Sequence, residues 1–497
     1  MPTAPFSKTS RRGWLQFGLC MTGILVISLG LRFWGLGRFN SLVFDEVYYA
    51  KFASAFLKRE IVFTGHPPLS TYIVAFGIWL GDSWWNNLQP KNDLAGLMLS
   101  PLSYRWLNAF TGAFIPLLVG AIAYLLTYRR RYALIAALLI AADGLFLVES
   151  RYALNNIYLI SLGLWGHIFL LLSLRASAGR RWLCLVLAGI GLGGAAAIKW
   201  NGLGFLLGAG SIWLLSWLVA FVQVIWPSLA AVHSSGQRIP QRSPLQNLTQ
   251  LKLGHAVVAF GVVPALTYYA SWLPYMQVDG TESSFWQLQG QTLDYHERVG
   301  GITAHPYCSR WYSWPLMIRP VAYFYQTVQA GAVPSPTDPA LQPLSNAAAI
   351  YDVHAMGNPP LWWFSTLAVL LLSSLLLQPL WRVVTVMRHR PVSGSASPIY
   401  LWAVVYLLVN WAANFLPWVR VTRCLFIYHY MESLVFATLL LALLIDRWFE
   451  GNPRQRRTAL LILGAILLGF IFWMPFYLGL PLSAEGLQIR RWLPSWI

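Results

Sequence analysis

Charge is scarce in this sequence. Only 10% of its 497 residues are Asp, Glu, Lys or Arg, whereas a soluble globular domain carries about 25%. Hydrophobic residues make up 57% of the chain, and many apolar runs approach the length of about 20 residues that crosses a bilayer. These values exclude an ordinary soluble domain and indicate an integral membrane protein.

Cysteine is scarce as well. Four cysteines are too few for a disulfide scaffold. Cys20 and Cys184 fall within apolar segments and are expected to be small core residues. Cys308 and Cys424 fall on or near the outer side of the topology predicted below. A bridge between them is one alternative, and unpaired thiols are the expectation.

Several motifs of soluble enzymes are missing. The sequence has no Walker A loop, no His-Glu-x-x-His, no Cys-x-x-Cys and no dinucleotide fingerprint, so nothing in it predicts ATP, zinc or a nucleotide cofactor. It also lacks the Asp-x-Asp of metal-dependent nucleotide-sugar enzymes. We therefore expect no cofactor and no metal, and any sugar donor is not a nucleotide sugar held through a metal.

Positive charge is in excess, with a net charge of +18, but its distribution argues against nucleic acid as a partner. A nucleic-acid groove needs basic residues on one contiguous surface. Here they form short clusters between apolar segments, which the positive-inside rule explains. The clusters are Lys8 with Arg11 and Arg12, Arg129 to Arg131, Arg180 with Arg181, Arg388 with Arg390, and Arg454 with Arg456 and Arg457.

About eleven apolar segments of near-spanning length follow one another along the chain. Only helices and closed barrels satisfy backbone hydrogen bonds in lipid, and these runs are too long for barrel strands. The predicted fold is an all-α membrane protein with about eleven transmembrane helices and amphipathic surface helices in its outer loops. The segments are 13–34, 101–127, 132–148, 153–174, 182–198, 200–226, 254–274, 360–381, 398–417, 425–446 and 458–479.

The basic clusters orient this bundle. With the N-terminus in the cytoplasm, the short basic loops lie on the cytoplasmic side. Residues 38–99 and 275–359 then form two long loops on the outer face, and 227–253 becomes a flexible cytoplasmic connector. We expect a single transmembrane domain over 1–497, with a four-helix part at about 360–497. It would lie in the cell membrane, in contact with lipid, and act at the outer face.

The first outer loop is not plain coil. Tyr48, Phe52 and Phe56 recur at helical spacing, which predicts an amphipathic helix on the membrane surface. His66-Pro67-Pro68 ends it, because proline disfavours helix for the residue before it. A second apolar stretch begins at Leu69.

Two adjacent carboxylates, Asp45 and Glu46, stand at the start of this helix. Neighbouring helical residues point about 100° apart, so one can face a site while the other orients a partner. Near an apolar boundary, desolvation raises a carboxyl pKa toward useful general-base values. The alternative is a plain helix N-terminal charge, favoured by the helix dipole.

Five cations fall at the predicted outer boundary of the bundle. Each alone is consistent with a side chain that snorkels to the interface. Together they indicate an anionic ligand, because guanidinium groups match phosphate oxygens. The five are Arg105, Arg151, Lys199, Arg420 and Arg423. Asp143 lies within the third span, where a carboxylate marks function by default or pairs with Arg105 or Arg151.

The second outer loop carries an aromatic run. It contains His305-Pro306-Tyr307 and, a few residues later, Trp311-Tyr312-Ser313-Trp314. Such a run is typical of the interfacial belt of a membrane protein. The interleaved His, Arg and Ser favour a rim that stacks on sugar or closes a site.

These landmarks together resemble the protein O-mannosyltransferase family of membrane glycosyltransferases. Phe44-Asp45-Glu46 followed by His66-Pro67-Pro68-Leu69 matches the first-loop signature of the family. The later landmarks resemble it in the same order along the chain. They are Arg105 with Phe110 and Gly112, Ser150-Arg151-Tyr152, Lys199-Trp200-x-Gly202, His305-Pro306-Tyr307 with Trp311 to Leu316, and Arg423 with His429-Tyr430.

The resemblance implies a polyprenyl-phosphate-mannose donor and transfer to Ser or Thr hydroxyls of exported proteins, with inversion. It implies Asp45 as general base and Glu46 as the residue that positions the acceptor. The donor phosphate would be bound by Arg105, Arg151, Lys199 and Arg423. The remaining substrate or loop positions would be His66, His305, Trp311, Trp314 and His429.

The sequence also departs from the family pattern. Asn155 and Asn156 stand where an acidic residue is frequent, and Met431 where proline is common. The loop 275–359 is too short for the soluble repeat domain of eukaryotic members, which points to a bacterial type. Two other functions stay open. One is a lipid-phosphate-sugar transferase acting on a lipid or glycan, and the other is a transporter or flippase, against which the absence of inverted repeats counts.

Overall fold

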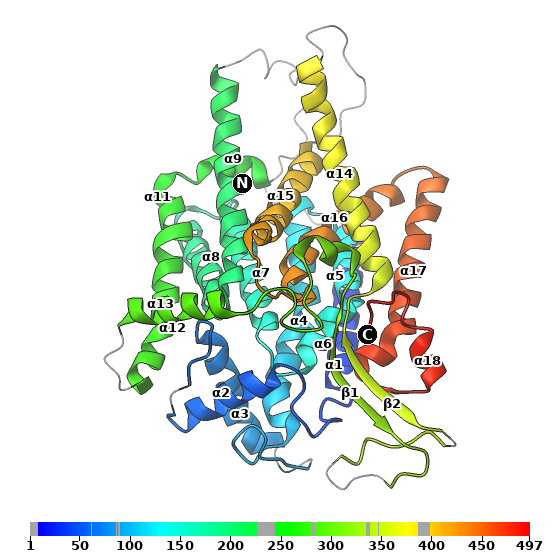
Figure 1. Ribbon diagram of the computed structural model, residues 1–497. Helices are drawn as coiled ribbons and strands as arrows, with labels where there is room; N and C mark the ends of the chain where they lie inside the picture. The colour runs from blue at the N-terminus through cyan, green and yellow to red at the C-terminus, as the bar shows by residue number, and fades with distance from the viewer. Residues whose placement is uncertain are drawn as a thin grey trace.

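The architecture is a bundle of long helices with a small antiparallel sheet near one end (Figure 1). This computed structural model describes residues 8–60, 62–85, 87, 90–225, 244–279, 284–333, 338–345, 347–385 and 398–497. Most of the expected cytoplasmic connector, at 226–243, lies outside these residues.

The longer helices follow the apolar segments of the sequence. They are α1 (Lys8–Phe33), α2 (Glu46–Leu57), α3 (Leu69–Trp85), α4 (Pro101–Thr127), α5 (Arg130–Ala141), α6 (Gly144–Arg151), α7 (Asn156–Ser173), α8 (Ala178–Ile198), α9 (Leu203–Ile225), α12 (Val263–Asp279), α13 (Phe285–Arg298), α14 (Pro359–Thr385), α15 (Pro398–Phe415), α16 (Met431–Phe449) and α17 (Pro453–Leu478). Shorter elements are η1 (Trp200–Gly202), η3 (Pro244–Gln250), α11 (Leu253–Ala256), η4 (Val257–Val262), η5 (Trp311–Leu316), η6 (Leu416–Arg420), η7 (Ile427–Tyr430) and α18 (Ala484–Gln488).

The membrane fold predicted from the sequence is confirmed. Within the described residues, ten helices are long and apolar enough to cross a membrane, and the bent pair α5 and α6 raises the number to eleven when it counts as one span. The two helices of that pair meet at 60°, so the third predicted span is broken rather than straight.

Asp143 causes this break. Its carboxylate caps α6 by accepting a hydrogen bond from the Phe146 amide at 3.0 Å. Its other oxygen accepts from the Trp362 indole at 2.8 Å and the Asn358 amide at 3.2 Å. The expected pairing with Arg105 or Arg151 is wrong, since Asp143 forms no ion pair within the described chain. The carboxylate is satisfied as a helix cap.

Small residues let the helices approach closely. A methyl group on Gly191 of α8 would lie 2.7 Å from the backbone nitrogen of Gly166 on α7. Because glycine has no side chain, the backbones of these two helices can come into contact here. Similarly, a methyl on Gly204 of α9 would lie 2.3 Å from the Asn414 amide oxygen on α15. Close contact through small residues is the usual way in which membrane helices associate.

The first outer loop forms α2 and α3, which lie at one end of the bundle (Figure 1). The surface helix predicted there is present, but the face that it buries is not the aromatic face used to predict it. Tyr49, Ala50 and Ala53 are buried, whereas Tyr48 is 56% exposed. Small side chains on the buried face let α2 pack tightly onto the protein, and the aromatic side chains lie around that contact.

The second long loop, 275–359, contributes two strands to a sheet that the sequence did not predict. Its strands β1 (Val321–Val328), β2 (Ala349–Ala355) and β3 (Pro481–Leu482) pair antiparallel in that order. The central strand β2 is buried along its whole length, and it packs on α6 and α17. The β1–β2 register shifts between Ala322 and Phe324, a bulge that re-aims the Tyr323 side chain.

Candidate active site

Asp45 immediately precedes α2. It stands at the N-cap position without making a capping hydrogen bond. Among the described residues, no side chain or amide donates a hydrogen bond to its partly buried carboxylate. Burial raises the pKa of Asp45 to about 6, and the nearby Lys199 ammonium opposes this rise. These properties suit a general base near neutral pH.

The backbone before Asp45 is strained and held from several sides. Phe44 has φ of +51°, a left-handed conformation that costs about 1–3 kcal/mol for a residue other than glycine. Its ring stacks on Tyr323 of β1 at 4.1 Å, and Phe426 and Tyr428 lie edge-on to it at 6.2 Å. The packing of Phe44 therefore fixes the direction of the residue that follows it.

Glu46 has the opposite environment and is fully buried. Arg105 binds it through two nitrogens, at 2.9 and 2.7 Å. The backbone amides of Val43 and Ala153 donate to it at 2.8 Å each. The carboxylate is thus enclosed by four donors and cannot contact an acceptor. The resemblance implied that Glu46 positions the acceptor. In the structure Glu46 instead anchors the loop that holds Asp45.

Arg105 is also committed to the fold. Besides Glu46, it donates to the carbonyl oxygens of Leu36, Phe39 and Ser41 at 2.7–3.2 Å. All five N–H groups of the guanidinium are therefore used. Arg105 does not line the cavity described below. The geometry corrects the expectation that this arginine binds phosphate.

Arg151 likewise forms its hydrogen bonds within the fold. It is buried and donates to the carbonyl oxygens of Leu31, Arg32, Trp34 and Gly35 at 2.8–3.2 Å. These carbonyls belong to the end of α1 and the turn after it, so Arg151 caps that helix end. It lies outside the cavity as well.

A large cavity of about 1450 Å³ lies beside Lys199. One part of its wall is apolar and comes mainly from α9, with Leu203, Leu206, Leu207 and Leu214. The other part is basic. It gathers His66, Lys199, His296, Arg420, Arg423 and His429 from separate segments of the chain. An amphiphile with a negative head and an apolar tail matches these two parts.

Lys199 links this cavity to the neighbourhood of Asp45. It lies where α8 ends, and its ammonium donates to the Asn156 amide oxygen at 3.3 Å. It also lies 5.1 Å from the centre of the Tyr428 ring. Only one of its three N–H donors has a protein acceptor among the described residues, so the ammonium can bind an anion in the cavity.

Two buried carboxylates near Lys199 were missed by sequence reasoning. Glu149 accepts hydrogen bonds from Asn156 at 3.0 Å and from the Tyr323 hydroxyl. Glu432 accepts one from Asn201. Glu432 lies within an apolar run of the sequence, and its position alone could have marked it as functional.

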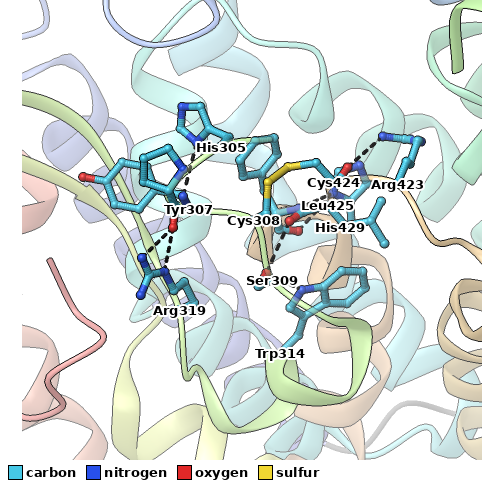
Figure 2. Close-up of a disulfide and its surroundings, with 12 residues drawn as sticks. His305, Tyr307, Cys308, Ser309, Trp314, Arg319, Arg423, Cys424, Leu425 and His429 are labelled. Carbon is cyan, nitrogen blue, oxygen red and sulfur yellow. Dashed lines mark hydrogen bonds between the residues drawn. A yellow bond between two sulfur atoms is a disulfide. The ribbon is translucent and has the colours of Figure 1, made fainter. Parts of the chain in front are cut away.

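A disulfide fastens the second outer loop to the cavity wall (Figure 2). Cys308 and Cys424 are bonded across 116 residues, so the expectation of unpaired thiols is wrong. The bridge is reinforced by backbone bonds from Ser309 to Leu425 at 2.7 Å and from Cys424 to Gly300 at 2.8 Å. Arg423, next to the bridge, makes one hydrogen bond, to the Cys424 carbonyl at 3.1 Å.

The two tryptophans of this loop pack against other side chains, whereas Tyr312 is 59% exposed. Trp314 is buried, donates its indole N–H to the Ser309 hydroxyl at 2.8 Å and lies against the His429 ring at 6.0 Å (Figure 2). Trp311 packs edge-on against Phe415. Neither tryptophan lines the cavity, and Trp314 packs behind His429, which does.

His305 and His429, the two histidines predicted in the late part of the chain, have different environments. His305 accepts a bond from the Tyr307 amide at 3.2 Å and is exposed outside the cavity, whereas His429 lines it. His66 and Lys199 line it too. In the described part of the chain, no group of three or more His, Cys, Asp or Glu side chains is arranged to hold a metal ion.

Comparisons with known proteins cover nearly the whole chain. The family model for dolichyl-phosphate-mannose-protein mannosyltransferase matches residues 22–269. The model for the C-terminal four TMM region of protein-O-mannosyltransferase matches residues 281–496.

Individual relatives agree with these models. The chain is 25% identical to the polyprenol-phosphate-mannose–protein mannosyltransferase of Mycolicibacterium smegmatis, over 96% of this chain and 93% of the relative. It is also 25% identical to that of Corynebacterium glutamicum, over 95% and 92%. Its fold is similar to the Saccharomyces cerevisiae Pmt1-Pmt2 complex bound to the sugar donor, with a TM-score of 0.74, 13% identity and coverage of 97% and 93%.

Proposed function

This chain belongs to the protein O-mannosyltransferase family, and from that premise we propose that it transfers mannose from a polyprenyl-phosphate-mannose donor to Ser or Thr hydroxyls of exported proteins, with inversion at the anomeric carbon. The chain is a glycosyltransferase and a multi-pass membrane protein. The donor follows from the names of the bacterial relatives.

The observation that carries this proposal is the unpaired carboxylate of Asp45 close to the basic part of the cavity. In the proposed reaction, Asp45 accepts the proton of the acceptor hydroxyl. The hydroxyl oxygen forms a bond to the anomeric carbon. The bond from that carbon to the phosphate oxygen breaks, and its electron pair stays on the phosphate. Attack and departure on opposite faces of the sugar give inversion.

The departing phosphate needs compensating positive charge. Lys199 and Arg423 line the basic part of the cavity and keep free N–H donors there. Preorganised donors of this kind stabilise charge that develops in the transition state. A phosphate is already a good leaving group, so the reaction needs no strong general acid. The apolar wall formed by α9 is suited to the polyprenyl chain.

The side of the membrane is part of the proposal. Basic clusters in short loops favour an outer face for the two long loops. The Cys308–Cys424 disulfide supports the same side, because disulfides persist in oxidising compartments. An outer-face site would meet acceptor chains as they are exported.

The test is transfer of labelled mannose from polyprenyl-phosphate mannose to a Ser/Thr-rich peptide, using purified membranes. We expect the natural chain to transfer and Asp45→Asn to lose about 10²–10⁴ of the rate, the usual contribution of a general base. Asp93→Asn is the matched control, since Asp93 is an exposed carboxylate of the same outer loop. The anomeric configuration of the product, read by NMR, tests inversion.

Each failure has a separate meaning. No transfer by the folded natural chain, with lipid or glycan acceptors mannosylated instead, would reject protein acceptors and favour the alternative transferase. Full transfer by Asp45→Asn would keep the reaction and reject Asp45 as its base.

A further inference from the structure

Two histidines from different outer loops meet at the basic part of the cavity. The rings of His66 and His296 lie with their centres 5.1 Å apart, and both residues line the cavity. The Nδ1 atom of each ring is buried and has no hydrogen-bond partner within the described structure. Two unpaired imidazole nitrogens beside an anion-binding cavity point to a ligand that completes their hydrogen bonds.

The chain is shaped to bring these rings together. Gly65, just before His66, has φ of +66°, and a methyl group there would lie 2.5 Å from the Tyr295 ring. Only glycine permits both this backbone conformation and this approach. Phe63 packs edge-on against the same ring at 5.9 Å. The first outer loop is therefore seated on α13 at the turn that carries His66.

The helix that carries His296 is fixed in turn. Ser284 and Gln287 form a capping box at the start of α13. The Tyr268 hydroxyl donates to Gln289 at 2.6 Å and accepts from the Trp200 indole at 2.9 Å. The Trp200 ring lies 5.6 Å from His296. This network holds the imidazole at the cavity without using its nitrogens.

The surroundings of the pair are mostly cationic. Burial lowers the pKa of His66 well below its usual value, with Lys199 the next contribution. Burial also lowers the pKa of His296, to about 4, and Arg423 adds to this. Both rings are therefore neutral in the empty site. The charged or titratable groups facing the pair or lining the cavity around it are Lys199, Arg420, Arg423, His429, Glu297 and Arg298, with Asp45 and Tyr295 close by.

The charge of the bound phosphate changes during the proposed reaction. A sugar phosphodiester carries one negative charge, whereas the released phosphomonoester has a second pKa of about 6 and gains a further charge near neutral pH. Arg423 carries a fixed charge across this step, because a guanidinium keeps its proton near neutral pH. A neutral imidazole can take up a proton when the neighbouring charge increases.

We propose that His66 and His296 bind the phosphate oxygens of the donor, and that His296 becomes protonated when transfer converts the diester into the lipid monophosphate. This inference rests on the proposed function and adds a second proton site to it. The proton of the acceptor hydroxyl goes to Asp45. The proton on the imidazole is taken up from the bulk solvent, to which Asp45 later releases the proton that it accepted, so atoms and charges balance. Loss of that proton then favours release of the product.

The test compares two ligands on the full-length chain in nanodiscs. Calorimetric titrations at pH 7, in buffers with different ionisation enthalpies, measure proton uptake on binding undecaprenyl phosphate and on binding its mannosylated form. For the natural chain we expect the monophosphate to take up about one proton more than the diester. His296→Gln is expected to abolish the difference. His305→Gln, an exposed histidine outside the cavity, is the control and is expected to retain it.

A merely structural role for the pair would weaken both ligands and leave the proton difference unchanged. His296→Asn repeats the measurement if His296→Gln does not fold. Equal proton uptake for both ligands in the natural chain, or an unchanged difference in either folded variant, overturns the proposal. Those outcomes leave the proposed function intact, whereas failure of the natural chain to bind either lipid would count against the function itself.

Discussion

Two sets of cations stand at the ends of apolar segments, and they have opposite environments. Arg105 and Arg151 are buried, and between them they donate nine hydrogen bonds, five from Arg105 and four from Arg151, to Glu46 and to backbone carbonyls. Lys199 and Arg423 face a cavity and make one hydrogen bond each.

The contrast shows that a charged residue in a sequence does not by itself reveal whether it stabilises the fold or binds a ligand. All four residues are cationic, and all stand at the ends of apolar segments. What separates them is whether nearby carbonyls are left without partners. Where a chain turns sharply, as after α1, its exposed carbonyls take most of the hydrogen bonds of the guanidinium, which is then committed to the fold. Satisfied donors stabilise the fold, and unsatisfied ones are available for binding.

Replacement of Arg105 is expected to have the largest effect. Arg105→Met leaves Glu46 charged and unpaired in a buried site, and breaking such a pair destabilises a protein by about 3–5 kcal/mol. We expect a lower thermal midpoint in detergent and poor recovery from membranes. Lys51→Met, on the exposed side of α2, is the control. A stable Arg105→Met protein that had lost only donor affinity would instead place Arg105 with the cavity cations.

Replacement of Arg423 is expected to act on binding alone. Hydrogen bonds to charged groups contribute about 1.5–3 kcal/mol, so Arg423→Gln should weaken donor affinity about 10- to 100-fold. The thermal midpoint should change little, because the side chain makes a single protein hydrogen bond. Binding of polyprenyl-phosphate mannose in nanodiscs measures this. Arg319→Gln is the control, since Arg319 bonds the Pro306 carbonyl outside the cavity. Unchanged affinity in Arg423→Gln would remove the distinction drawn between the two sets.

The pH dependence of kcat/KM extends the comparison to the carboxylate of Asp45. The pKa of Asp45 is raised to about 6, and a general base acts in its ionised form. We therefore expect kcat/KM to be flat above this pH and to fall about tenfold per unit below it. Asp93→Asn should keep this profile. A rate that stays constant down to pH 5 would mean that Asp45 does not titrate in the active range, or is not the base.

Much of the fold follows from the sequence because membrane burial leaves a strong pattern. Long apolar runs predicted the spans within a few residues, and the helix at 46–57 followed from aromatic spacing. The bend at Asp143 did not follow, since the cap depends on Asn358 and Trp362, more than two hundred residues away. The sheet was missed for a similar reason, because β1 and β2 pair across the intervening residues 329–348, and β2 also pairs with β3 near the end of the chain.

Only part of the candidate site could be predicted from the sequence. Asp45, His66, Lys199, Arg423 and His429 were identified as candidates, and apart from Asp45 these residues line one cavity. His296 carries no local signal, since it stands on an ordinary amphipathic helix and becomes notable only through its contact with His66. The roles of Arg105 and Glu46 depend on pairing across 59 residues, which a sequence alone does not show.

The smallest expected effect comes from the disulfide. A bridge typically stabilises a soluble protein by about 2–4 kcal/mol through the unfolded chain. Here the bridged segments are also joined by backbone bonds, and neighbouring spans restrict both ends. We therefore expect Cys308→Ser with Cys424→Ser to lower stability by only about 1 kcal/mol.

The informative measurement for this variant is donor affinity, with Cys20→Ser, an unpaired cysteine far from the site, as control. Arg423 adjoins the bridge, so loosening that segment should weaken donor binding a few-fold while leaving Asp45 and the slope of the pH profile unchanged. A loss as large as that of Arg423→Gln would mean that the bridge sets the position of the cation. No loss would mean that the backbone bonds to Leu425 and Gly300 suffice to hold it, and the difference between the two sets of cations would then depend on hydrogen bonding alone.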